Sequence, residues 1–158
     1  MKKTVAIAGA TGFIGKWFID KYKNEFNIIA LSRNKLRYPE KSNIHWKQVD
    51  LYSISSTTKA LENVDIGIYL VHSMQPSTRM NQGSFEDTDI LLADNFSRAA
   101  QDCKLEQIIY VGGILPKDEY TMSKHLRSRY EVEKTLGSGL TPLTSIRAGI
   151  IIGPNGSS

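Results

Sequence analysis

The amino-acid sequence predicts an α/β fold, a three-layer doubly wound parallel sheet with strand order 3-2-1-4-5-6. Three observations predict it. Short apolar segments alternate with helical patterns along the chain, these segments are apolar at nearly every residue, and the first runs directly into glycines that open a helix. Strands that are apolar on both faces need helices on both sides of a parallel sheet. Right-handed crossovers then give the doubly wound order, with ligands at the carboxyl ends of the strands.

The first half of the chain predicts four strands and two helices. Thr4 to Ala8 is wholly apolar after its first residue, and the next apolar repeat (Ile14, Phe18, Tyr22) has helical spacing. The helix is expected over about 12–24. A second helix is expected over 53–61, with Ser53 as its N-cap. The other strands of this half are expected at 27–31, 44–49 and 64–71.

The second half predicts two more strands and two more helices. A stripe of Leu92, Phe96, Ala99 and Cys103 marks the buried side of a long helix that begins near Phe85. The remaining elements are a strand at 107–111, a helix at 122–136 and a strand at 143–152.

Composition excludes several classes of protein. The 158 residues suit one domain, and 41% hydrophobic with 23% charged residues is ordinary for a folded globular chain. No apolar run reaches the length of a membrane span, and the N-terminus has no secretory pattern, so a cytoplasmic protein is expected. Cys103 is the only cysteine, which excludes a disulfide framework and a cysteine metal cluster within this sequence.

The net charge of +4 is spread along the chain. Two small basic groups occur, around Arg33 and around Arg127, whereas a nucleic-acid binder concentrates basic and aromatic residues on one face. The groups fit either a phosphate-bearing small molecule or solvated surface. The expected partners are therefore a dinucleotide and an unidentified small substrate or protein, with no nucleic acid and no membrane span.

Three glycines at intervals of three residues follow the first strand. Gly9 permits a tight turn, Gly12 lets the backbone approach a pyrophosphate, and Gly15 lets helix and strand pack closely. The helix N-terminus then offers free N–H groups to phosphates. The pattern predicts a dinucleotide site, with its loop contributed also by Thr11, Phe13 and Ile14.

The end of the second strand predicts which dinucleotide is bound. NAD sites place a carboxylate there for the ribose 2′-hydroxyl, but this chain has Ser32 and Arg33. Arg33 could pair with a 2′-phosphate, so NADP(H) is expected in preference to NAD(H). The alternative is that Arg33 is an ordinary surface residue.

Two further strand ends contribute expected contacts. Asp50 and Leu51 end the third strand, where the carboxylate could accept from the adenine amine or could simply cap the turn before the helix. Val71 and His72 end the fourth strand, near the expected path of the nicotinamide ribose. A lone histidine there is also compatible with a structural role.

The chain resembles short-chain dehydrogenase/reductase proteins in its Thr-Gly-x-x-Gly motif and in Asp50-Leu51. Four further segments resemble the atypical, NmrA-like NAD(P)H-binding branch, which includes proteins similar to the NADPH-binding accessory subunit of respiratory complex I. These segments are 69–74, 110–113, 125–129 and 147–153. The resemblance implies a Rossmann domain over residues 1–158. It also implies a longer protein with a C-terminal lobe that this chain lacks.

In the reductases of this superfamily a tyrosine, a lysine four residues later and an upstream serine act on the substrate. Tyr120 and Lys124 match the Tyr-x-x-x-Lys spacing. Counting back from Arg147 instead places the pair on His125 and Arg129, with glycines at the serine position. His125 could act as an acid or base and Arg129 could hold oxygens, or the two could form a structural pair. An NADP(H)-binding redox sensor or assembly or regulatory protein is favoured, and an NADPH-dependent oxidoreductase of a small carbonyl or quinone substrate is the alternative.

Overall fold

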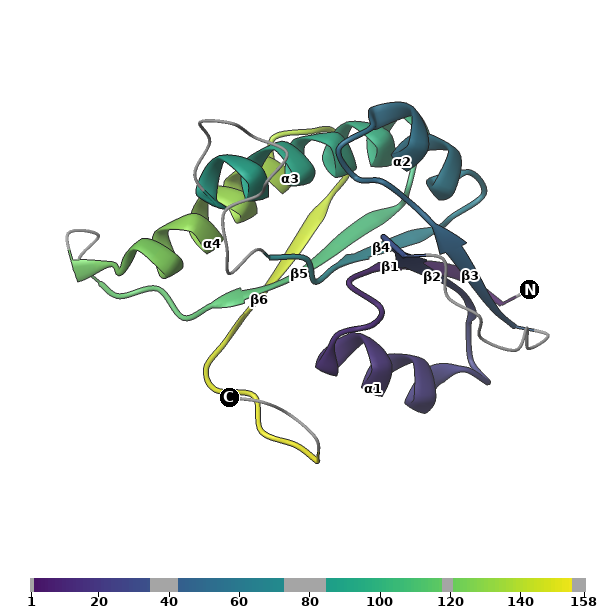
Figure 1. Ribbon diagram of the computed structural model, residues 1–158, viewed down its shortest axis with the longest axis horizontal. Coiled ribbons are helices and arrows are strands. Elements are labelled where there is room, and N and C mark those ends of the chain that lie inside the picture. Colours follow the sequence, from purple (N-terminus) through teal and green to yellow (C-terminus); the bar gives the residue numbers. More distant parts are fainter. Residues whose placement is uncertain (1, 35–42, 73–84, 118–120, 155–158) are drawn as a thin grey trace.

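Six parallel strands form one sheet in the order β3-β2-β1-β4-β5-β6, as the sequence predicts (Figure 1). The computed structural model describes residues 2–34, 43–72, 85–117 and 121–154. The strands are β1 Thr4–Ala8, β2 Asn27–Ser32, β3 Ile44–Gln48, β4 Ile66–Tyr69, β5 Gln107–Gly113 and β6 Leu143–Ala148. The helices are α1 Phe13–Tyr22, α2 Ile54–Leu61, α3 Phe85–Asp102 and α4 Lys124–Leu136.

The helices cover the sheet from both sides (Figure 1). α1 lies on one face, and α2, α3 and α4 lie on the other. This division follows from the strand order, because right-handed crossovers that move in opposite directions along a sheet fall on opposite faces. The switch of direction falls between β1 and β4, which are neighbours in the sheet although they are far apart in sequence. In doubly wound folds ligands bind where the direction changes.

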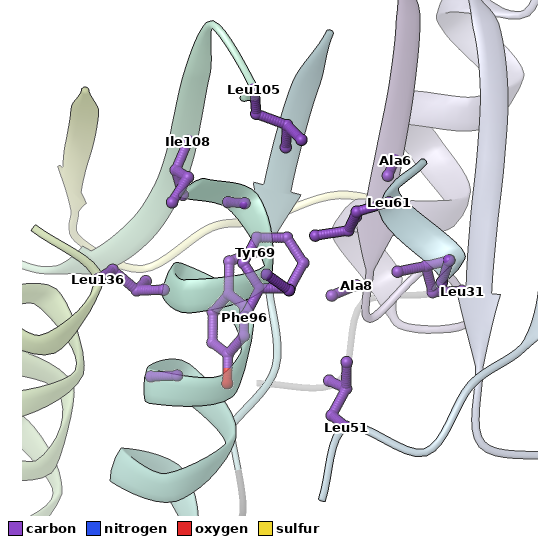
Figure 2. Close-up of a cluster of buried hydrophobic side chains, with 14 of the residues drawn as sticks. Ala6, Ala8, Leu31, Leu51, Leu61, Tyr69, Phe96, Leu105, Ile108 and Leu136 are labelled. Carbon is purple, nitrogen blue, oxygen red and sulfur yellow. The ribbon is translucent and has the colours of Figure 1, made fainter. Parts of the chain in front are cut away.

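The core has one part for each face of the sheet. On the face covered by α2, α3 and α4, the rings of Tyr69 and Phe96 lie edge to face with centroids 5.1 Å apart (Figure 2). Both residues have no exposed surface. On the α1 face, the apolar side chains of β1 and β2 pack around Ile19. The expectation of strands buried on both faces is therefore confirmed for the two central strands β1 and β2.

Two predicted strands are shorter than their apolar runs. The sequence predicts a strand over 143–152, but β6 ends at Ala148, because its partner β5 ends and Ile114 donates the last backbone hydrogen bond to Ala148. β4 likewise ends at Tyr69, opposite the end of β1. β6 is an edge strand, and Ile146 keeps 49% of its surface exposed. Hydrophobic patterns predict the type and position of an element more reliably than its length, because neighbouring strands decide where a strand ends.

Helix boundaries agree closely with the expected ones. α2 begins after Ser53, whose hydroxyl accepts a hydrogen bond from the backbone N–H of Ser56, as predicted. α4 begins at Lys124 rather than at residue 122, because Ser123 caps it. Among the described residues, no helix has the length and apolar character that a bilayer crossing requires.

Candidate functional site

A tight turn joins β1 to α1 at the carboxyl edge of the sheet. Gly9 has a φ of +90°, which side chains rarely adopt, and its carbonyl accepts a hydrogen bond from the N–H of Gly12 at 3.0 Å. A β-carbon on Gly9 would also lie 3.0 Å from the β-carbon of Leu70 on the neighbouring chain segment. The turn therefore requires glycine for both conformation and space, as the sequence predicts.

The third glycine permits the close approach of α1 to the turn. A β-carbon on Gly15 would lie 2.5 Å from the carbonyl oxygen of Gly9 and 2.7 Å from the Cα of Ala10. Both are backbone atoms that cannot move independently of the turn. Gly12 is exposed at the helix N-terminus, and a β-carbon there would meet only the Gly9 oxygen, at 3.2 Å.

The N-terminus of α1 has no side-chain cap, whereas Ser53 and Ser123 cap α2 and α4 through their hydroxyls. The first N–H groups of a helix need acceptors, and they also carry the positive end of the helix dipole. Thr11 is exposed beside this end, and Phe13 and Ile14 are half-buried in the first turn. A helix N-terminus without a side-chain cap, next to the exposed Gly12, makes a cradle that suits the pyrophosphate of a dinucleotide.

The end of β2 lies beside this cradle, because β2 pairs with β1 in register up to Leu31. Ser32 is half-buried and accepts a hydrogen bond from the N–H of Asn34. Arg33 is exposed, and its carbonyl accepts from the side-chain amide of Gln48 at 3.2 Å. Gln48 thus holds the backbone at Arg33, whose side chain is exposed.

The next contacts expected from the sequence follow β3. The Asp50 carboxylate accepts from the N–H of Tyr52, and the N–H of Asp50 donates to Ser56, so Asp50 has the turn-capping role considered above. The residue is also exposed. Leu51 is buried in the core, and its carbonyl accepts from the buried amide of Asn95. These bonds fix the chain at this point of the sheet edge.

A cluster of basic side chains forms where the end of β4 meets α4. We call His72, His125 and Arg129 the imidazole cluster. The Nε–H of Arg129 donates to Nε2 of His125 at 3.2 Å, and the rings of His72 and His125 stand edge to face with centroids 6.1 Å apart. Val71 precedes His72 and packs half-buried against the core. The structure thus brings His72 beside His125 and Arg129, which the sequence already indicates as a pair.

Both histidines in the cluster favour their neutral forms. Loss of water around the ring lowers the pKa of His72, and the nearby Arg129 and His125 lower it further. Partial burial and the Arg129 guanidinium lower the pKa of His125. Near neutral pH the cluster therefore carries its positive charge on Arg129.

The end of β5 lies beside the cluster, as the sequence predicts. A β-carbon on Gly113 would lie 2.7 Å from Cδ1 of Leu126 and 3.9 Å from Cδ of Arg129. Glycines 112 and 113 therefore occupy the strand end at which the resemblance would place a serine, and side chains of α4 pack over them.

The other proposed pair, Tyr120 and Lys124, lies only partly within the described residues. Tyr120 lies outside the described residues, and Lys124 is the exposed first residue of α4. Since Ser123 is the N-cap, residue 120 precedes the helix. The spacing argument for one helix face applies to His125 and Arg129, which both lie on α4.

Two contacts of the site were missed from the sequence. The hydroxyl of Tyr110, on β5, donates to the carbonyl of Arg129 at 3.1 Å and so ties α4 to the sheet. The segment after β6 returns to α1, where a β-carbon on Gly153 would lie 2.7 Å from the ring of Phe13. A glycine at position 153 is a signal in the sequence for a close approach, but the segment that it approaches is decided by the tertiary structure.

Comparison with known proteins agrees with this geometry. A family model described as NAD(P)H-binding matches residues 9–140, from the glycine turn to the loop before β6. The auxiliary protein GraX of Staphylococcus aureus is 30% identical over an alignment of 118 residues, which covers 72% of this chain and 37% of GraX. The chain thus spans little more than a third of the length of this curated relative.

Solved structures share the fold at low sequence identity. The oxidoreductase ylbE of Lactococcus lactis matches with a TM-score of 0.73 at 18% identity, over 91% of this chain and 68% of its own. WbmG of Bordetella bronchiseptica, solved with NAD and UDP, matches with a TM-score of 0.74 at 13% identity, over 90% and 52%. A UDP-N-acetylglucosamine 4-epimerase of Bacillus cereus matches with a TM-score of 0.70 at 20% identity, over 92% and 53%.

Proposed function

Since this chain belongs to the NAD(P)H-binding family, as a Rossmann protein of the atypical short-chain dehydrogenase/reductase type, we propose that it binds NADP(H) and senses or relays its redox state. The role would be that of a regulatory or assembly protein rather than a catalyst. The observation that carries the proposal is the uncapped N-terminus of α1 beside the glycine turn, with Arg33 at the adjoining strand end. The single cysteine and the ordinary composition favour a cytoplasmic setting.

The dinucleotide would lie across the carboxyl edge of the sheet. Its pyrophosphate would accept from the first N–H groups of α1, at Phe13 and Ile14, with Thr11 and the open Cα of Gly12 beside it. Asp50 and Leu51 would border the adenine, and Val71 and His72 would border the nicotinamide ribose. The bound group supplies a hydride or accepts one, and the residues of this chain bind and orient it.

Arg33 would select the phosphorylated dinucleotide. A guanidinium that pairs with the ribose 2′-phosphate makes charge-assisted bonds, which contribute about 1.5–3 kcal/mol. The half-buried hydroxyl of Ser32 would add a donor. No carboxylate stands at residues 30 to 34, where NAD-specific sites place one for the 2′-hydroxyl.

We expect Arg33→Ala to weaken NADPH binding about 10- to 100-fold while NADH binding changes little, because only NADPH carries the 2′-phosphate. The measurement is a fluorescence titration that follows energy transfer from Trp17 and Trp46 to the reduced nicotinamide. Lys59→Ala is the matched control, since it removes a positive charge from an exposed position on α2. Equal losses for NADPH and NADH in Arg33→Ala would contradict the assignment.

The regulatory role is favoured because this chain lacks the serine, tyrosine and lysine expected at the catalytic positions of the superfamily. Glycines occupy the end of β5, and histidine and arginine occupy the two α4 positions. GraX, the curated relative, is described as an auxiliary protein. An NADPH-dependent oxidoreductase of a small carbonyl or quinone substrate is the second candidate, and the imidazole cluster at the nicotinamide end favours it. In that case His125 would touch the substrate oxygen.

A turnover assay separates the two candidates. If the protein is a sensor, NADPH absorbance stays constant in the presence of a panel of aldehydes, ketones and quinones. If it is an oxidoreductase, NADPH is consumed with one of them, and His125→Ala abolishes the consumption while NADPH binding persists. Turnover that survives in His125→Ala would exclude His125 as its catalytic residue. His45→Ala, on exposed β3, is the control for loss of a histidine.

A further inference from the structure

The hydrogen bond between Arg129 and His125 restricts the chemistry of the histidine. The Nε–H of Arg129 lies 3.2 Å from Nε2 of His125, one helical turn away. A guanidinium has only donors and stays charged in proteins. Nε2 must therefore carry a lone pair rather than a proton, and the proton of a neutral imidazole must lie on Nδ1.

Arg129 is itself held in place. Its carbonyl accepts a hydrogen bond from Tyr110 on β5, and the pKa of that tyrosine is raised to about 12, chiefly by burial. The phenol therefore remains a donor at every physiological pH. Gly113 leaves the space in which the aliphatic part of Arg129 passes, 3.9 Å from the position that a β-carbon would take. Backbone and side chain of Arg129 are thus both positioned by β5.

The described groups around His125 come from three elements, and the nearby carboxylate of Glu133 is bound elsewhere. His72 faces it from the end of β4, Tyr110 from β5 and Arg129 from its own helix. Glu133, one turn beyond Arg129, is engaged by Arg147 and Ser145 of β6 at 2.7 Å each. Burial alone would raise the pKa of Glu133, but those hydrogen bonds lower it, so the carboxylate stays ionised and occupied on β6.

We propose that Arg129 is a positioning residue that fixes His125 as the neutral Nδ1–H tautomer. His125 then meets a ligand at this end of the sheet as a hydrogen-bond donor through Nδ1, not as a base through Nε2. The class of group that suits it is an oxygen acceptor, such as a carbonyl or a carboxylate. The choice of ligand rests on the proposed function, whereas the tautomer is a property of the protein alone.

Nitrogen-15 NMR of histidine-labelled protein tests the proposal, because long-range proton–nitrogen correlations distinguish the two neutral tautomers. The chain has three histidines, at 45, 72 and 125, so each can be assigned by substitution. At pH 7.5 we expect His125 to be the Nδ1–H tautomer in the unaltered chain. His45, exposed on β3, serves as the internal reference.

A variant of the protein then tests the role of Arg129, the hydrogen-bond donor to His125. In Arg129→Met the Nδ1–H preference of His125 should disappear and its pKa should rise, because both the hydrogen bond and the neighbouring positive charge are lost. Arg127→Met removes an exposed arginine from the same helix and should leave His125 unchanged. An Nε2–H tautomer in the unaltered chain, or an unchanged tautomer in Arg129→Met, would overturn the proposal.

The design stays decisive if Arg129→Met does not fold, since the spectrum of the unaltered protein already tests the tautomer. An NADPH titration of the same sample keeps the two proposals separate. Loss of the expected tautomer with intact NADPH binding refutes the role of Arg129 only. The expected tautomer without NADPH binding refutes the proposed cofactor site only.

Discussion

We expect Gly15→Ala to lower the free energy of unfolding by about 1–3 kcal/mol, which corresponds to a fall in Tm of several degrees. In an open helix the same change stabilises by up to about 1 kcal/mol, because alanine is the better helix former. Here the new methyl group would lie 2.5 Å from the Gly9 oxygen and 2.7 Å from the Cα of Ala10. These are backbone atoms of the turn, so α1 must move outward. The sign of the change in Tm, measured by thermal denaturation, therefore reports the packing of α1 on the turn.

Gly12→Ala is the matched control for this result. Its new methyl group meets only one atom within 4 Å, the Gly9 oxygen at 3.2 Å, and the φ of −74° suits alanine. We expect a stability loss below about 1 kcal/mol, typical of an N-cap change. Both variants should lose NADPH affinity, Gly15→Ala through displacement of the helix and Gly12→Ala through the methyl group in the cradle. A Tm for Gly15→Ala at or above that of the unaltered chain would contradict the packing argument.

Phe96→Ala is expected to cost about 3–5 kcal/mol, because it removes a fully buried ring and leaves a cavity that the sheet cannot fill. Phe96 contacts Tyr69 edge to face, and its ring lies 3.0 Å from the position that a β-carbon on Gly67 would take. A domain of this size has about 5–15 kcal/mol of net stability in total. The variant should therefore be close to the unfolding threshold at 37 °C, which chemical denaturation would reveal as a large fall in midpoint.

Leu91→Ala on the same helix provides the comparison, since that leucine is 38% exposed and its loss should cost well under half as much. Phe96→Leu should fall between them, because it keeps most of the apolar volume. Equal midpoints for Phe96→Ala and Leu91→Ala would show that the Tyr69–Phe96 pair is not central to the core.

The sequence predicts the secondary structure well, because the patterns that indicate it arise from interactions between residues close together in the chain. Apolar runs of strand length, helical stripes and the Ser53 cap depend on neighbours within one turn or one strand. The six strands and four helices of the described residues were accordingly predicted, with errors confined to their ends. Those ends depend on where adjacent strands stop, as at Ala148 beside the end of β5.

The candidate site divides in the same way. The glycine turn is encoded within seven residues, and the spacing of His125 and Arg129 places them on one helix face. The sequence also indicates His72 and Gly113 as ends of strands. It cannot give the distance between His72 and His125, because 52 residues and a complete strand–helix unit separate them.

The sequence by itself determined the order of the elements, the three-layer sheet and the position of the glycine turn, because hydrophobic periodicity and glycine conformation act locally. Only the tertiary structure decided that Arg129 donates to His125, that Tyr110 holds Arg129 and that Gly153 approaches Phe13. These contacts join separate elements or depend on side-chain rotamers, which the packing of α4 against β5 selects. The fold class can thus be predicted from local patterns in the sequence. The chemistry of the site depends on distances between side chains of different elements, which the packing of helices on the sheet determines.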